Sequence, residues 1–416
     1  MHVFTLVFVT ALSVTLGFKL WLARRHLGHV RAHREQVPEE FAARIPLASH
    51  QKAADYTVAK TRLATLDTIA DAMLLLLLTL GGGLAIIDAT SQSLLGTGLM
   101  RGLGLLAGVA LVTGCVNLPF AIYRTFVIEA RFGFNKITPA LFIADLVKQT
   151  LLGAVIGLPL ALAVLWMMEQ LGPLWWLYAW LTWIAFNVLM LAVFPVWIAP
   201  LLNHFTPLND QALRQRIEGL VAKCGFRAKG LFVMDGSKRS GHGNAYFTGL
   251  GQSKRIVFFD TLLERLNGAE IEAVLAHELG HFKRHHITKR IAVSFALSFV
   301  FLALLGWIMD KPWFYSGLNA GEQSTGMALV LFFLVMPVFL FVLQPLSSFY
   351  SRQHEFEADA YAAQQTGAAD LISALVKLYQ DNAATLTPDP LHSVVYDSHP
   401  PAALRIAHLQ GAALSR

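Results

Sequence analysis

Cysteine is scarce in this sequence, which contains only two among 416 residues. Cys115 lies inside a long apolar stretch and Cys224 inside a polar one, so the chain offers no pair for a structural disulfide. A metal site built from thiolates needs several cysteines close together, and the sequence excludes that site as well. Any metal that the chain binds must therefore be held by histidine and carboxylate side chains.

Charge is scarce too, because only 14% of the residues are charged whereas 55% are hydrophobic. Soluble domains carry about 25% charged residues, so the composition indicates a membrane protein instead. A helix needs roughly 20 apolar residues to cross a hydrocarbon core about 30 Å thick. Seven segments fit a membrane span, of which the fourth is short: 2–22, 68–87, 103–122, 151–168, 174–198, 291–309 and 327–343.

Basic residues outnumber acidic ones, for a formal net charge of +6, but they lack the interleaved aromatics of a nucleic-acid surface. Many of them follow the first and third predicted spans, where they set the topology and contact lipid head groups. The loops after the second, fourth and sixth spans carry only Arg101 and Lys311. The positive-inside rule therefore predicts an outer N-terminus and a cytoplasmic C-terminus, and we expect no nucleic-acid partner.

A basic segment before the first apolar stretch is missing, which argues for a retained membrane helix and against a cleaved signal peptide. Internal repeats and low-complexity linkers are missing as well. Residues 24–65 are polar and are predicted to form a cytoplasmic connector with no fold that the sequence specifies. Gly81, Gly82 and Gly83 fall inside the second span, where they predict close helix packing or a kink.

The segment His277-Glu278-Leu279-Gly280-His281 has the pattern of a zinc peptidase helix. His277 and His281 are four residues apart, so on a helix they lie on one face, about 5–6 Å apart, and can bind one metal ion. Zinc with three protein ligands keeps one position for water and lowers the pKa of that water to about 7. Glu278 is then the candidate general base.

A third ligand is expected after the seventh span. Residues 200–290 and 351–416 are polar and flank two spans that cross and return, so both pieces lie on one side and can form one split domain. Glu355 and Asp359 are four residues apart on a predicted helix, which makes Glu355 a candidate ligand and Asp359 a candidate partner of a ligand imidazole. By spacing alone, His354 is an alternative ligand.

Together these motifs resemble the Ste24 family of integral-membrane zinc metalloproteases, the type I CAAX prenyl proteases of peptidase family M48. The His-Glu-x-x-His pattern alone occurs in many unrelated peptidases, but the combination of motifs is specific, and the similarity runs through most of the chain. The other matching segments are 128–129, 131–136, 198–208, 235–239, 244–247, 254–262 and the one around Glu355.

The resemblance implies an all-α integral membrane protein with about seven transmembrane helices that form a hollow chamber. It also implies a split cytoplasmic α+β protease domain of the gluzincin type, with the metal site at the cytoplasmic end of the chamber. The implied division is 1–199 for helices one to five, 200–290 for the first part of the protease domain, 291–350 for helices six and seven, and 351–416 for the second part of that domain.

Several site residues follow only from the resemblance. Glu355 becomes the third zinc ligand, although His354 and Glu357 depart from the Phe and Gln that the family usually has there. His399 is expected to stabilise the oxyanion, and an arginine six residues further on is expected to anchor the site. The remaining positions are Arg405, which is that arginine, and Asn244 and Ala245, which are expected to contact the peptide substrate by strand addition.

We therefore predict a membrane-embedded zinc endopeptidase that acts beside membrane lipid on peptides or proteins, including those with a prenylated C-terminus. A bacterial inner membrane, with the active site on its cytoplasmic side, is the expected location. One alternative is a quality-control protease that requires no prenyl group. Another is a transporter or channel with a structural zinc site, in which Asp71 and Asp145 would line an ion pathway. His285 is expected on the surface.

Overall fold

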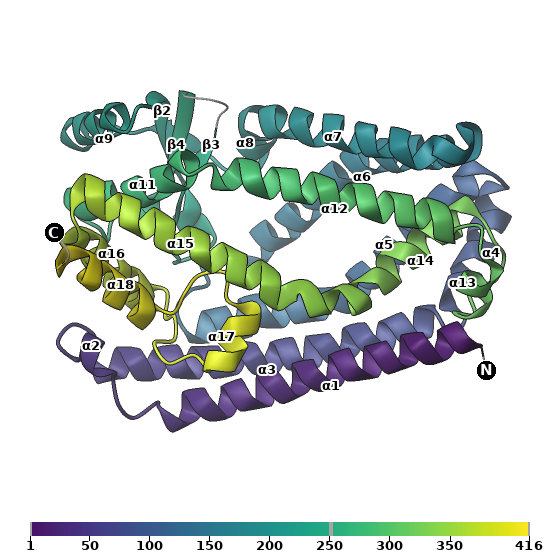
Figure 1. The fold of residues 1–416 in the computed structure, drawn as a ribbon, viewed down its shortest axis with the longest axis horizontal. Helices are drawn as coiled ribbons and strands as arrows, with labels where there is room; N and C mark the ends of the chain where they lie inside the picture. The colour runs from purple at the N-terminus through teal and green to yellow at the C-terminus, as the bar shows by residue number, and fades with distance from the viewer. Residues whose placement is uncertain (1, 249–252, 415–416) are drawn as a thin grey trace.

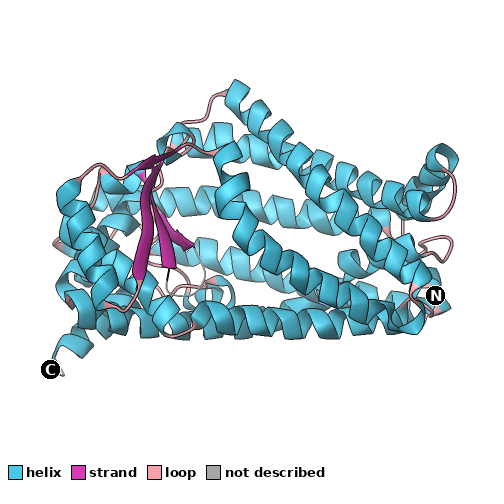
Figure 2. Ribbon diagram, turned by 90° about the horizontal axis from the view of Figure 1, so that it is seen from above, coloured by secondary structure: helices cyan, strands magenta, loops and turns pink. Residues whose placement is uncertain are grey.

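The computed structural model describes residues 2–248 and 253–414, most of which are helical (Figure 1). Long helices run along the long axis of the molecule, while the strands and several shorter helices gather at one end. The chain begins at the end opposite the strands and finishes near them (Figure 2). The molecule is thus an elongated helical part with an α/β part at one end.

Six helical units among the described residues are long and apolar enough to cross a membrane, and the bent pair α3 and α4 gives a seventh. In five of the six, only 6–11% of the most apolar stretch is buried within the chain, so the rest requires apolar surroundings. The principal helices are α1 Val3–Ala32, α3 Leu47–Leu78, α4 Gly83–Leu95, α5 Leu99–Tyr123, α6 Pro139–Gln170, α7 Trp175–Val193, α12 His286–Ile308 and α14 Thr325–Leu340.

The second predicted span, 68–87, is not one straight helix but is broken at the glycine triplet. Helices α3 and α4 meet at the glycine triplet with a bend of 60°. Gly82 has a φ of +78°, a left-handed conformation that favours glycine. Gly81 has no room for a side chain, because a Cβ there would lie 2.7 Å from the carbonyl oxygen of Leu77. Of the two outcomes expected for the triplet, the structure shows the kink.

The polar segment 24–65, whose order the sequence left open, is largely helical. Helix α1 continues through its first part, a short helix α2 spans Glu39–Ala42, and α3 begins soon afterwards. Phe41 and Ile45 are only 0% and 3% exposed and belong to the apolar core of the α/β part. The connector therefore packs against the α/β part, which is formed by residues far later in the sequence.

The α/β part contains one four-stranded sheet with the order β1-β2-β4-β3. Strands β2 and β4 are parallel, whereas β1 and β3 each pair antiparallel with one neighbour, so β3 lies at an edge. The strands are β1 Phe205–Pro207, β2 Arg227–Met234, β3 Ala245–Thr248 and β4 Ser253–Phe259. The remaining α-helices are α8 Ala199–Leu202, α9 Gln211–Lys223, α10 Asp260–Leu263, α11 Gly268–Lys283, α13 Pro312–Ser316, α15 Gln344–Thr366, α16 Ala368–Asp381, α17 Pro390–Tyr396 and α18 Ala402–Leu414.

Helices α11 and α15 lie side by side in the α/β part, although they are far apart in sequence (Figure 1). Helices α12 and α14 run away from this end and back, which returns the chain to α11 as α15. Leu275 and Leu279 of α11 share a buried core with Ala362 of α15, and each buried leucine stabilises it by about 1.5–3 kcal/mol. Gly280 allows the close approach, since a Cβ there would lie 3.0 Å from the Cα of Ala358.

Candidate metal centre

Helix α11 begins with a capping box that fixes its position. The Asn267 side chain accepts hydrogen bonds from the backbone amides of Ala269 and Glu270, while the Glu270 carboxylate accepts one from the Asn267 amide at 2.8 Å. The same carboxylate is buried and also accepts bonds from Lys377 at 2.8 Å and Ser373 at 2.7 Å. The helix that carries the histidine motif is therefore tied to α16 at its first turn.

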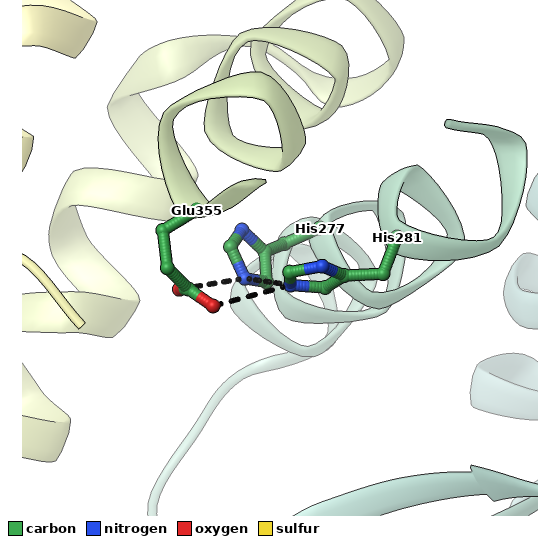
Figure 3. Close-up of side chains that lie close together, drawn as sticks. All are labelled: His277, His281 and Glu355. Carbon is green, nitrogen blue, oxygen red and sulfur yellow. Dashed lines mark hydrogen bonds and ion pairs between the residues drawn. The ribbon is translucent and has the colours of Figure 1, made fainter. Parts of the chain in front are cut away.

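His277 and His281 point from α11 toward Glu355 on α15 (Figure 3). The two Nε2 atoms lie 3.2 Å apart, and each lies 3.4 Å from an oxygen of the Glu355 carboxylate. A tetrahedral zinc ion with bonds of about 2.0–2.1 Å holds its ligand atoms about 3.3–3.4 Å apart. The donor set and its spacing therefore fit one divalent metal ion.

Asp359 supports His277 from the side away from this cluster. Its carboxylate is fully buried and lies 2.8 Å from Nδ1 of His277. Arg405, from α18, donates to both oxygens of that carboxylate at 2.8 and 2.6 Å. Burial lowers the pKa of His277, but hydrogen bonds to Asp359 and Glu355 outweigh it and raise the pKa to about 9. Asp359 therefore directs Nε2 of His277 toward the cluster, which is the position predicted for it.

His399 reaches the cluster from the segment between α17 and α18. Its Nδ1 lies 2.7 Å from Oε2 of Glu355, and its side chain is 62% exposed. Nη1 of Arg405 approaches the same oxygen at 3.7 Å. Both residues expected near the metal from the resemblance are thus brought to it, from a part of the chain more than 40 residues beyond Glu355.

Glu278 follows His277 on α11 and is half-buried. Within the described residues its carboxylate makes no hydrogen bond or ion pair, whereas the carboxylates of Glu355 and Asp359 are both held by neighbours. The Glu278 carboxylate is thus left free of protein partners in the described structure, directly beside His277 in the chain.

The chain matches two family models that together cover nearly all of it. The model described as CAAX prenyl protease N-terminal, five membrane helices, matches residues 26–204, and that of peptidase family M48 matches residues 207–413. The chain belongs to peptidase family M48. Its membrane helices and its metal-binding part therefore come from one known architecture, and the family predicted from the sequence is confirmed.

Curated relatives and a solved structure agree with this assignment. A CAAX prenyl protease 1 homolog of Arabidopsis thaliana is 40% identical over 71% of this chain and 70% of its own length. CAAX prenyl protease 1 of Saccharomyces cerevisiae is 36% identical over 78% of this chain and 73% of its own. The crystal structure of S. mikatae Ste24p superposes with a TM-score of 0.91, at 31% identity, over 98% of this chain and 99% of that one.

These matches show that the chain is a membrane-embedded metalloendopeptidase that acts on peptides or proteins. They confirm the predicted fold and enzyme class. The helical units and the family match also show a multi-pass integral membrane protein. The relatives named here are eukaryotic, so they give no support to the bacterial source expected from the sequence.

His286 is a feature of this M48 site that the sequence analysis missed. Its ring is 3% exposed, with Nδ1 3.0 Å from Nδ1 of His281 and Nε2 3.0 Å from Glu357. His354 stacks on it, with ring centroids 3.9 Å apart, and so lies outside the three-residue cluster. His285 turns the chain at a φ of +58° and is exposed, which agrees with the surface position expected for it.

The two predicted substrate contacts lie at the edge of the sheet. Ala245 begins β3, and the Asn244 carbonyl accepts a hydrogen bond from the Phe259 amide at 2.9 Å. Among the described residues β3 pairs with β4 alone, so its other edge is open to an added strand. Phe247 lies 5.9 Å, between ring centroids, from Phe282 of α11. The open edge thus belongs to a strand that packs against the helix of the histidine motif.

Proposed function

We propose that this protein is a zinc endopeptidase in which His277, His281 and Glu355 hold the metal. The observation that carries the proposal is the spacing of 3.2–3.4 Å between the donor atoms of these three residues. Two imidazoles and one carboxylate form the ligand set of several zinc peptidases. When bound, zinc activates water for attack on a peptide bond and polarises the carbonyl that is attacked.

The surrounding residues supply proton transfer, oxyanion stabilisation and positioning of a ligand. Glu278 accepts the proton of the attacking water and delivers it to the leaving amine, because its carboxylate is adjacent to His277 and has no competing partner in the described structure. His399 is largely exposed beside the cluster and donates to the developing oxyanion, a contribution of about 3 kcal/mol for one such donor. Asp359 and Arg405 position His277.

We further propose that the peptide adds to the open edge of β3, where Asn244 and Ala245 lie. Backbone hydrogen bonds along an edge strand give affinity that depends little on sequence. This position suits an enzyme whose substrate must lie extended across the metal site, because an extended chain presents its carbonyls at regular intervals.

The relatives carry the name CAAX prenyl protease, and we propose a C-terminally prenylated substrate for this chain. A cavity of about 600 Å³ lies between α6, α7, α12 and α14, and most of its lining is apolar. Leu160, Phe301 and Phe332 are among the lining residues. An isoprenyl chain offers only hydrocarbon, so it would be stabilised there by burial in proportion to its area.

We place the active site on the cytoplasmic side of the membrane. The metal cluster lies in the α/β part, and the N-terminus lies at the opposite end of the molecule (Figure 1). The Lys- and Arg-rich segment 24–65 packs against the same α/β part through Phe41 and Ile45. The positive-inside rule assigns such a segment to the cytoplasm.

The transporter alternative loses part of its sequence support. Asp145 of α6 is not an isolated intramembrane acid, because Arg239 donates to both of its oxygens at 2.7 and 3.0 Å. That arginine also donates to the Leu202 carbonyl at 2.7 Å and to Asn203 at 3.2 Å. The pair therefore joins a membrane helix to the protease part, which is a structural role.

The test is a comparison of purified wild type with Glu278→Gln, using one peptide with and without a prenyl group. We expect the variant to retain one zinc per chain by elemental analysis while losing cleavage of both peptides. We expect the wild type to prefer the prenylated peptide, with products mapped by mass. Undiminished turnover by Glu278→Gln would refute the assigned base, and a fully active sample without zinc would refute the metal.

A further inference from the structure

A cavity of about 400 Å³ adjoins the metal cluster and reaches helix α3. His399, whose Nδ1 lies 2.7 Å from Glu355, lines one part of it. Lys60 and Thr61 of α3 line another part. The volume lies within the range of small-ligand pockets, about 300–1,000 Å³. A lysine of α3 therefore lines the same open cleft as His399, which contacts the metal cluster.

The ammonium group of Lys60 forms no ion pair with the described residues, although the charge of Glu129 acts on it from farther away. Its Nζ lies 4.0 Å from the centre of the Tyr56 ring, and within the described residues no acidic oxygen lies within 4.0 Å of it. The nearby acid Glu129 is already engaged, because it accepts a hydrogen bond from Tyr56 at 2.6 Å and lies 3.5 Å from Nε2 of His242. A cation–π contact leaves the ammonium hydrogens that point away from the ring able to donate.

The cavity continues past Lys60 into a second one of about 520 Å³. The two share Lys60, Thr61, His392 and Tyr396, and the second also reaches Lys19 of α1. The Lys19 ammonium lies 4.8 Å from the centre of the Phe341 ring. Two lysines thus line one continuous cleft that leads away from the metal cluster.

Acidic groups do little to balance this charge. Asp397 is the acidic residue that lines the first cavity among the described residues, against Lys60 and three histidines. Asp389, close to the same wall, is paired with Arg25 at 2.9 Å. Among the groups that line both cavities, cations and imidazoles therefore predominate, and an anion entering the cleft meets Lys60 before Lys19.

We propose that Lys60 binds the C-terminal carboxylate of the substrate and so directs cleavage to bonds near a free C-terminus. This inference rests on the proposed peptidase function. A peptide that lies across the metal cluster can extend its leaving portion into the cavity that His399 and Lys60 line, and a terminal carboxylate is the one anion that every such portion carries. A hydrogen bond to a charged group of this kind corresponds to roughly tenfold or more in affinity.

The test measures binding without turnover. Two peptides of identical sequence, one ending in a free carboxylate and one in an amide, are titrated into Glu278→Gln protein in neutral detergent and followed by fluorescence anisotropy. We expect the acid to bind about tenfold more tightly. Adding Lys60→Gln should abolish the difference by weakening the acid alone, and Lys60→Arg should preserve it. Unchanged affinity for the amide shows that the Lys60→Gln protein is folded.

The matched control is Lys52→Gln. Lys52 lies on the same helix and also contacts an aromatic ring, with its Nζ 4.9 Å from the centre of Phe134, but it does not line either cavity. This variant should keep the preference for the acid. Loss of the preference in Lys52→Gln as well would overturn the assignment, because it would reflect the overall charge of α3.

Three further results would overturn the proposal. Equal affinity for the acid and the amide would show that no carboxylate site exists. A preference for the acid that survives Lys60→Gln would show that Lys60 is not part of that site. Equal affinity together with a dependence on anionic lipid vesicles, lost in Lys60→Gln, would assign the cation to a lipid head group. Absence of cleavage by wild type, with the binding preference intact, would refute the peptidase function and leave the carboxylate site standing.

Discussion

His286 supports His281 from behind, with its Nδ1 3.0 Å from the Nδ1 of the proposed ligand and its Nε2 3.0 Å from Glu357. The ring is buried and stacked on His354 at 3.9 Å, so it cannot rotate freely. A ligand imidazole needs its second nitrogen engaged if the first is to point steadily at a metal ion. His286 performs for His281 the role that Asp359 performs for His277.

We predict that His286→Ala weakens metal binding by about 10–100-fold, because the His281 ring loses its partner. Zinc affinity should be measured by competition with a chromophoric chelator. His286→Gln should restore part of the affinity, since an amide can still bond to both neighbours. The matched control is His285→Asn, because asparagine tolerates the left-handed backbone at that exposed position. Full zinc affinity in His286→Ala would contradict the positioning role.

The approach of α11 to α15 gives a second prediction. Gly280→Ala should lower stability by about 1–3 kcal/mol, because its Cβ would lie 3.0 Å from the backbone of Ala358, which cannot move aside as a flexible side chain can. It should also weaken zinc binding, since the two helices carry the ligands. Thermal unfolding and chelator competition measure the two effects.

Gly219→Ala is the matched control for that substitution. Gly219 also lies within a helix, α9, but no atom lies within 4 Å of a Cβ built there. Alanine stabilises a helix interior by about 0.8–1.0 kcal/mol relative to glycine, so this variant should be neutral or more stable than wild type. Equal destabilisation by both variants would show that the helix contact at Gly280 does not explain the effect.

Local spacing made part of the site predictable. His277 and His281 are neighbours by helical periodicity alone, and Asp359 faces the same way as Glu355 for the same reason. Glu355 could be preferred over His354 only through the family resemblance, because adjacent residues point in different directions and periodicity does not say which direction faces the metal. The structure brings Glu355 to the histidines and turns His354 onto His286.

Other features depend on contacts that the sequence does not encode locally. His286 reaches His281 across the break between α11 and α12, where His285 adopts a left-handed φ of +58°. Phe41 and Ile45 look like apolar residues of a polar connector, yet they are buried against helices more than 150 residues away. The kink of the second span was foreseeable as glycine chemistry, but its 60° angle was not.

The pair of Asp145 and Arg239 predicts a characteristic order of stabilities. Arg239→Leu should lower apparent stability by about 2–3 kcal/mol, because it leaves a buried carboxylate of α6 without its cation. Removing both charges in Asp145→Leu/Arg239→Leu should cost less than Arg239→Leu alone. Thermal unfolding of the three proteins in one detergent gives the comparison. If the double variant were the least stable of the three proteins, the ion pair would stabilise the fold by more than it costs to bury its two charges.

Glu270 should make the stability of the protease part depend on pH in a defined direction. Burial acts to raise the pKa of this carboxyl, but hydrogen bonds from Lys377, Asn267 and Ser373 outweigh it, so the pKa lies below its ordinary value. A carboxyl with a lowered folded pKa contributes stability that is present above its unfolded pKa, about 4.3, and is lost as the pH falls through the folded value.

Glu270→Gln should therefore be less stable than wild type at pH 7 by about 1–2 kcal/mol, and the difference should shrink below about pH 4.3 as the wild-type carboxyl takes up its proton. Unfolding midpoints measured from pH 7 to pH 3 provide the test, with Glu272→Gln as control because Glu272 forms its ion pair with the half-exposed Arg216. A stability difference that stays constant across this pH range would show that the variant loses packing or neutral hydrogen bonds and not the charge of Glu270. A difference that closes as predicted would show that the charge itself ties the first turn of α11, and so the spacing of its two histidines, to α16.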